Sequence, residues 1–279
     1  MREHTIDSIN SKAKSIESTQ IPTSSAIESI KAVDSIAQST QSPNPTIDST
    51  KATNTIESAI DSMPDIVFFG MRFEPRTWKR VSPPVITQPL CEEEILYEVF
   101  AHCATPPWHI WAKLYKASHI ARVIDLLVAH MGADTRLTMA EDVLKSFWIC
   151  ALAHSSVGIR DKLYVYCDSH SSITRKIDTA TRDKKIADIS RVIEQLDSLS
   201  SVAALRANRS FTPAQTRAIN ILKSVRELEY RYDTINGGGD THILPPYLRA
   251  CLRSLGYHRK WQSFVRIALY LLSLGRLKL

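Results

Sequence analysis

Two apolar stripes at helical spacing constrain the fold of this chain more than any other feature. Within 186–207, apolar or small residues recur every three or four positions, and the same spacing continues over 214–235. Such stripes lie on one face of a helix and need a partner to cover them. Only a short join, ending at Pro213, separates the two stripes. The sequence therefore predicts an antiparallel helical hairpin within 171–240.

The remaining patterns are also mainly helical, so we predict an all-α fold. Further helices are expected at about 89–103, 105–115, 118–132 and 138–151, with Thr138 and Glu141 forming a capping box. Short strands are the expected minor exceptions, at Ile66–Phe69 and Leu163–Cys167. The predicted organisation is a disordered tail at 1–62, a Pro-containing transition at 63–90, an N-terminal helical subdomain at 91–170, the hairpin at 171–240 and basic C-terminal helices at 241–279.

Residues 1–62, which we call the repeat segment, contain six copies of the tripeptide Ile-acid-Ser. The segment has eight acidic and five basic side chains, and no aromatic residue precedes Phe68. A segment of this composition buries too little apolar surface to offset its ordering entropy, so we predict a disordered tail. The regular isoleucines leave a second interpretation open, in which the tail docks on a protein partner.

The net positive charge of the chain is concentrated at its C-terminal end. Residues 241–279 hold seven Lys/Arg and no Asp or Glu, whereas residues 1–240 carry a net charge of −1. Such a field attracts polyanions, and neighbouring aromatic rings can stack on exposed bases. The predicted nucleic-acid-binding residues are Arg249, Arg253, Arg259, Lys260, Trp261 and Arg266.

The last predicted helix has one apolar and one basic face. From Trp261, the apolar face continues through Phe264 and Leu271 to Gly275, while Arg266 lies on the other face. Three interpretations remain open. The helix closes a core with its apolar face and shows its basic face to solvent, it binds nucleic acid through the basic face, or it lies on an anionic membrane surface.

Four residues have the spacing of a zinc site, namely Cys150, His154, Cys167 and His170. Cys150 lies in an apolar run, however, where a buried thiol is ordinary. We therefore predict no metal and no cofactor. The chain also lacks a phosphate-binding loop, a nucleophile elbow and a zinc-protease motif, which indicates a protein that is not an enzyme.

These features predict a structural or scaffold protein that binds RNA or, with less support, DNA. A flexible tail joined to a basic helical body is also the arrangement of viral nucleoproteins and matrix proteins, an analogy of architecture alone. The alternative is a helical adaptor for proteins, placed in one version at an anionic membrane surface.

The expected location is cytoplasmic or nuclear. The start of the chain lacks the apolar run of a secretory signal, and the five cysteines are scattered and odd in number. The longest strongly apolar run, Ile267–Leu272, is far shorter than the roughly 20 residues of a membrane-spanning helix.

Overall fold

The fold was analysed in a computed structural model of the chain. The residues that it describes are 63–75, 82–132, 136–167, 178–229, 244–258 and 261–273. The predictions made for the repeat segment and for His170, Arg259 and Lys260 lie outside these ranges.

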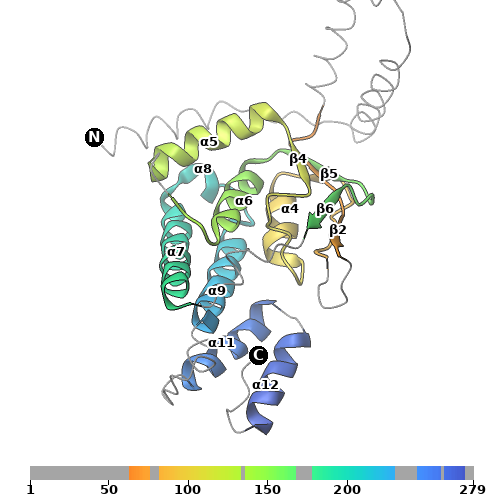
Figure 1. Ribbon diagram of the computed structural model, residues 1–279. Coiled ribbons are helices and arrows are strands. Elements are labelled where there is room, and N and C mark those ends of the chain that lie inside the picture. Colours follow the sequence, from red (N-terminus) through yellow and green to blue (C-terminus); the bar gives the residue numbers. More distant parts are fainter. Residues whose placement is uncertain are drawn as a thin grey trace, which may run out of the picture.

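A four-stranded sheet lies at one side of the molecule (Figure 1). Its inner strand β1 is short, β-branched or aromatic at every position, and fully buried, as expected for a strand covered on both faces. β1 pairs in parallel with β5, while the outer pairs are antiparallel. In spatial order the strands are β3 (Leu90–Cys91), β5 (Ser155–Gly158), β1 (Ile66–Phe68) and β4 (Lys113–Tyr115).

A separate two-stranded ribbon joins β2 (Met71–Glu74) to β6 (Tyr164–Cys167) in parallel. One face of the ribbon is aromatic because Phe73 pairs with Tyr166, two residues after Tyr164. The ring of Trp111 stacks on that of Tyr164 at 5.3 Å between centroids, so the ribbon has a small aromatic cluster of its own.

Helices cover the sheet and build most of the core. Helix α4 (Glu93–Leu96) continues directly into the π-helix η1 (Tyr97–His102), and together they bury four consecutive or near-consecutive apolar side chains. Helix α5 (Ala117–Met131) ends at Gly132, whose φ of 81° is the left-handed conformation that glycine adopts without strain. Helix α6 (Glu141–Leu152) is the most deeply buried, and its Phe147 and Trp148 are almost inaccessible to solvent.

The predicted hairpin is confirmed. Helix α7 (Thr179–Ser198) is followed by the 3-10 helix η3 (Leu199–Ser201), α8 (Ala203–Arg206) and α9 (Phe211–Glu229), and α7 packs against α9. The two helices are antiparallel, because contacts near the end of one involve the start of the other. Gln215 donates a hydrogen bond to the Leu196 carbonyl, whereas Lys185 forms an ion pair with Glu229.

Two further helices lie beyond one end of this hairpin, the end that is remote from α8 (Figure 1). Helix α11 (Leu244–His258) packs on α9, and α12 (Trp261–Leu272) packs on α11. They form a second, smaller core from Leu228 of α9 with Tyr247, Cys251 and Tyr270. The main core lies between the sheet, α4 to α6 and the hairpin.

The all-α prediction holds only in part, because the mostly helical body includes the four-stranded sheet and the ribbon. The two strands that were expected, at Ile66–Phe69 and Leu163–Cys167, are present as β1 and β6. The predicted helix over 105–115 is wrong, because most of this stretch is irregular and its end pairs with β1 as strand β4.

The predicted capping box is also wrong. Helix α6 follows Ala140, whose φ of 63° is left-handed, and no side chain caps its first turn. Thr138 instead donates two hydrogen bonds to the Asp188 carboxylate of α7, from its backbone N–H at 3.0 Å and from Oγ1 at 2.7 Å. Thr138, which was expected to cap α6, therefore connects the loop before α6 to α7.

Candidate functional site

The predicted basic face is only partly a free cationic surface. Arg249 is exposed on α11. Arg253, one helical turn later, donates a hydrogen bond to Glu227 of α9 at 2.8 Å, and both side chains are 20% exposed. Glu227 lies 26 positions before Arg253 along the chain, so the sequence around Arg253 does not indicate this ion pair. Arg266 is half-buried, and Trp261 begins α12 without a described side chain.

Helix α12 presents its apolar face outward. Tyr270 is 7% exposed and packs on Tyr247 of α11, with 5.2 Å between ring centroids, and Ile267 adjoins the same small core. Five apolar residues on the opposite face of the helix are all exposed, and Leu272 is 83% exposed. We call this set the outer stripe, and it consists of Phe264, Val265, Ala268, Leu271 and Leu272.

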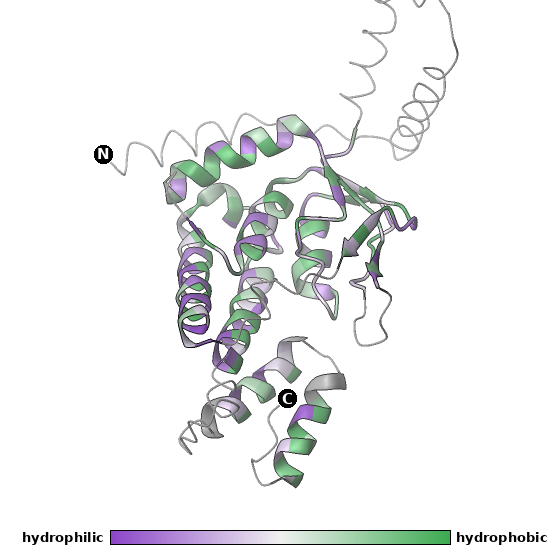
Figure 2. Cartoon of the chain, in the orientation of Figure 1, coloured by the Kyte–Doolittle hydropathy of each residue, from purple (hydrophilic) through white to green (hydrophobic). Residues whose placement is uncertain are grey.

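This orientation overturns the interpretation in which these same apolar residues close a core. Figure 2 shows hydrophobic residues along α12, and the exposed fractions place the largest of them on the solvent side. The helix is held instead through its mixed face, where tyrosine rings supply the contact area. Contiguous apolar surface on a protein marks an interaction site more often than scattered apolar residues do.

A pocket of about 340 Å³ lies where η1, the start of α9 and the end of α11 meet. Its one deeply buried cation is Arg217 of α9. Arg217 donates hydrogen bonds to the carbonyls of Phe100 at 2.9 Å, Cys103 at 2.6 Å and Tyr257 at 2.7 Å. Carbonyls at the ends of two helices lack intrahelical partners, and a guanidinium satisfies them. The arginine therefore joins η1 to α11. Its guanidinium N–H groups bind backbone carbonyls, which indicates a structural role.

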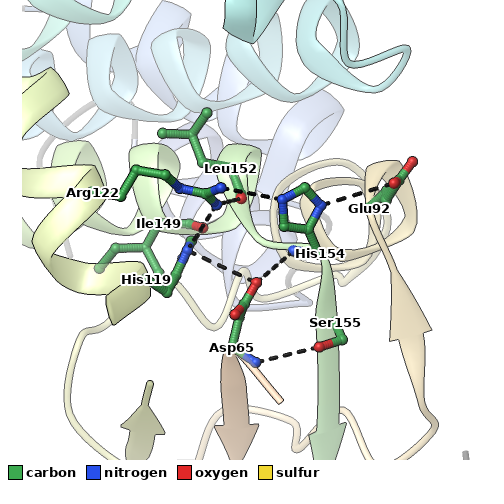
Figure 3. A network of polar contacts seen from close by, with 8 residues as sticks. All are labelled: Asp65, Glu92, His119, Arg122, Ile149, Leu152, His154 and Ser155. Atoms are coloured by element: carbon green, nitrogen blue, oxygen red, sulfur yellow. Dashed lines mark hydrogen bonds and ion pairs between the residues drawn. The ribbon is translucent and has the colours of Figure 1, made fainter. Parts of the chain in front are cut away.

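A network of polar side chains lies where the starts of β1, β5 and α5 meet the end of α6 (Figure 3). Asp65 immediately precedes β1 and Ser155 begins β5, so both lie at the N-terminal ends of parallel strands. His119 and Arg122 come from the first turns of α5, while His154 lies in the short connection between α6 and β5.

Arg122 is at the centre of this network. Its guanidinium donates to His119 Nδ1 and to His154 Nε2, each at 3.2 Å, and to the Leu152 carbonyl. The Asp65 carboxylate accepts the backbone N–H of His154 at 2.8 Å and lies 3.9 Å from His119 Nδ1. His154 Nδ1 is 3.9 Å from Glu92.

The hydrogen bonds define the state of His119. Its Nε2 lies 3.0 Å from the Ile149 carbonyl, which can only accept, so Nε2 carries the proton and Nδ1 accepts from Arg122. Burial lowers the pKa of His119 below its ordinary value of 6.5; Asp65 opposes this shift and Arg122 adds to it. His119 is therefore neutral in the folded protein at neutral pH.

This network fits a structural role better than a catalytic one. Ligands of parallel sheets bind outside the carboxyl ends of the strands, whereas Asp65 and Ser155 lie at the opposite ends. Ser155 Oγ accepts the Asp65 N–H at 3.4 Å rather than facing a histidine base. The network joins α5 to β1 and β5. No local pattern in the sequence indicates it, because its members come from four separate segments.

A substitution of His119 tests this state. Glutamine can keep both hydrogen bonds but cannot titrate. In the native protein, unfolding exposes a histidine that binds a proton more readily, so the free energy of unfolding falls as pH drops below about 6.5. We expect His119→Gln to have a smaller fall between pH 7.5 and 4.5, measured by urea unfolding at several pH values. The slope does not vanish, because burial also lowers the pKa values of His109 and His130.

The candidate zinc ligands do not converge among the described residues. Cys150 is buried in α6, 3.9 Å from Ser146 Oγ, and burial raises the pKa of its thiol to about 11. His154 turns toward Arg122 and Glu92, and Cys167 is exposed on β6. Within the part of the chain that the structure describes, no three His, Cys, Asp or Glu side chains are grouped as metal ligands.

Comparisons with known proteins give no indication of the function. No family model, no curated protein and no solved structure matches the chain. Among the described helices, none combines the length and the apolar character required to cross a bilayer.

Proposed function

We propose that the protein is a non-enzymatic structural protein that attaches to an anionic membrane surface through α12. The observation that carries this proposal is the outward orientation of the outer stripe. A helix with an exposed apolar face, set in a segment with an excess of Lys/Arg, shares these two features with helices that lie in a membrane interface. Its apolar side chains enter the acyl region while the cationic side chains remain among the headgroups.

The charge distribution favours an anionic surface as the partner. The segment 241–279 that contains α12 has seven Lys/Arg and no acidic residue. Each Lys or Arg near an anionic leaflet contributes about 1 kcal/mol of attraction, which salt screens. Full burial of a leucine or phenylalanine side chain contributes about 1.5–3 kcal/mol. The outer stripe and those cations that are not already paired, as Arg253 is with Glu227, would both favour attachment.

RNA binding through the same helices, the leading prediction from the sequence, has less support from the geometry. Phosphate contacts need cationic side chains that are exposed and not already paired with a carboxylate. Arg253 is already paired with Glu227, and the exposed face of α12 is apolar rather than basic. Of the three predicted arginines that the structure describes, Arg249 alone is exposed.

The test is cosedimentation of the full chain with vesicles of phosphatidylcholine containing or lacking phosphatidylserine. We expect binding to the anionic vesicles that weakens as salt rises. The double variant Leu271→Ser, Leu272→Ser should bind at least about tenfold more weakly, because each leucine contributes more than about 1.4 kcal/mol when buried in the acyl region. Both leucines are exposed, so the fold is expected to survive the change.

The matched control is Leu163→Ser, which removes an equally exposed leucine from the loop before β6 and should leave vesicle binding unchanged. The same proteins are titrated into a labelled single-stranded RNA. Binding to RNA that is lost in Arg249→Glu but kept in the double leucine variant, with no binding to vesicles, would replace the membrane proposal with the nucleic-acid one.

A further inference from the structure

The outer stripe has no cover among the described residues, although free apolar surface of this kind is unfavourable in water. We propose that in the absence of a membrane the repeat segment of the same chain docks on the outer stripe. The docking itself is independent of the lipid partner, whereas its regulatory consequence rests on the proposed function.

The chemistry of the repeat segment complements that of α12. Each Ile-acid-Ser tripeptide places an apolar side chain directly beside a carboxylate. The outer stripe places apolar side chains on a helix that carries Arg266 and lies within a segment devoid of acids. Residues 1–62 have a net charge of −3 and residues 241–279 a net charge of +7. An isoleucine can thus cover the stripe while its neighbouring carboxylate approaches the basic side chains.

A second copy of α12 is a poorer occupant. Pairing two outer stripes across a two-fold axis would bring together two segments that each hold seven Lys/Arg and no carboxylate. Like charges placed together across an interface cost several kcal/mol in discrimination between partners. The acidic repeat segment meets no such repulsion.

The length of the repeat segment allows it to reach α12 from the start of β1. A chain spans at most about 3.3–3.6 Å per residue, so 62 residues extend on the order of 200 Å. Attachment to the same chain gives the docking residues an effective concentration near the millimolar range. One tripeptide buries little area, but six interchangeable copies compete for the same stripe, which raises its total occupancy.

Docking of this kind would make attachment to a membrane conditional. Repeat segment and acyl chains would compete for the same five side chains, so the free protein would be held in a state with lower affinity for vesicles. The apparent affinity is reduced by the fraction of molecules whose stripe is uncovered. An anionic membrane would release the repeat segment by supplying both a larger apolar surface and a denser negative charge.

Photo-crosslinking in the full chain tests the docking without any lipid. p-Benzoylphenylalanine replaces Phe264, which is 63% exposed, and in a matched control it replaces Leu163, which is 61% exposed. We expect irradiation of the first protein to give adducts within a single chain, mapped by mass spectrometry to residues 1–62. The second protein should give few such adducts. Absence of adducts to the repeat segment from position 264, or adducts only between two chains, would overturn the proposal.

A second variant distinguishes docking of the repeat segment from non-specific crosslinking by the probe. It replaces the isoleucines of the six tripeptides with serine, which leaves every charge in place, at Ile6, Ile16, Ile27, Ile47, Ile56 and Ile60. The adducts from position 264 should fall to the level of the Leu163 control. Adducts that persist unchanged would show that the isoleucines do not occupy the stripe, and would contradict the inference.

The vesicle experiment distinguishes failure of the docking from failure of the proposed function. If half of the stripes are covered, the serine variant should bind anionic vesicles about twofold more tightly than the native chain. Adducts to the repeat segment without vesicle binding would retain the docking and remove the membrane function. Vesicle binding without adducts would do the reverse.

Discussion

Replacing Arg217 with methionine is expected to lower the free energy of unfolding by about 3–5 kcal/mol. The guanidinium donates to four carbonyls, those of Phe100, Cys103, Ala104 and Tyr257, and the residue is 9% exposed. Hydrogen bonds from a charged donor contribute about 1.5–3 kcal/mol each, and effects within one group of contacts are not additive. Urea unfolding followed by circular dichroism measures the loss.

The structure also specifies where the Arg217→Met protein should be weakened first. Tyr257 lies near the end of α11, so amide hydrogen exchange of α11 should increase more than that of α7. Arg217→Lys is the matched control, since it retains the charge but not the planar set of donors, and it should recover only part of the loss. A loss below about 1 kcal/mol in the methionine variant would mean that water replaces the guanidinium at all four carbonyls.

Phe147→Ala is expected to destabilise the protein by a similar amount, about 3–5 kcal/mol. Phe147 is fully buried and contacts rings from two other elements, Phe100 of η1 at 5.0 Å and Phe211 of α9 at 5.7 Å. Alanine removes these edge-to-face contacts and leaves a cavity where the sheet-covering helices meet the hairpin. The midpoint of thermal unfolding should fall accordingly.

Phe147→Leu provides the comparison, because it keeps much of the volume and should cost clearly less than the alanine change. Leu114→Ala controls for the general effect of shortening an apolar side chain, since Leu114 is exposed and should change stability by less than about 0.5 kcal/mol. Equal losses for Phe147→Ala and Phe147→Leu would indicate that the ring contacts, rather than the volume, determine the stability of this junction.

The long helices were predictable because their periodicity extends over several turns. The hairpin of α7 and α9 and the end of α5 at Gly132 follow from apolar spacing and from the conformational freedom of glycine. Strands β2, β3, β4 and β5 were not predicted, since two to four residues are too few to establish an alternation. Their partners lie far away in the chain.

The site was less predictable than the fold, and for a different reason. Hydropathy identifies the two faces of α12 but not the face that meets α11, and the rings of Tyr247 and Tyr270 decide that choice. Likewise, Arg253 has an acidic partner that only the packing of α11 on α9 brings close. The nucleic-acid interpretation depends on an exposed basic face, whereas the residues of α12 that are exposed in the structure are the apolar ones.

The pairing of β1 with β5 has a consequence for synthesis of the chain on the ribosome. Ile66 pairs with Ser156, so the inner strand β1 emerges some 90 residues before its parallel neighbour. At roughly 5–20 residues per second, this interval lasts on the order of 5–20 seconds. Throughout it, β1 lacks the strand that pairs with it in parallel. Early-acting chaperones that bind short apolar stretches would therefore be expected to contact residues 66–68 of the nascent chain.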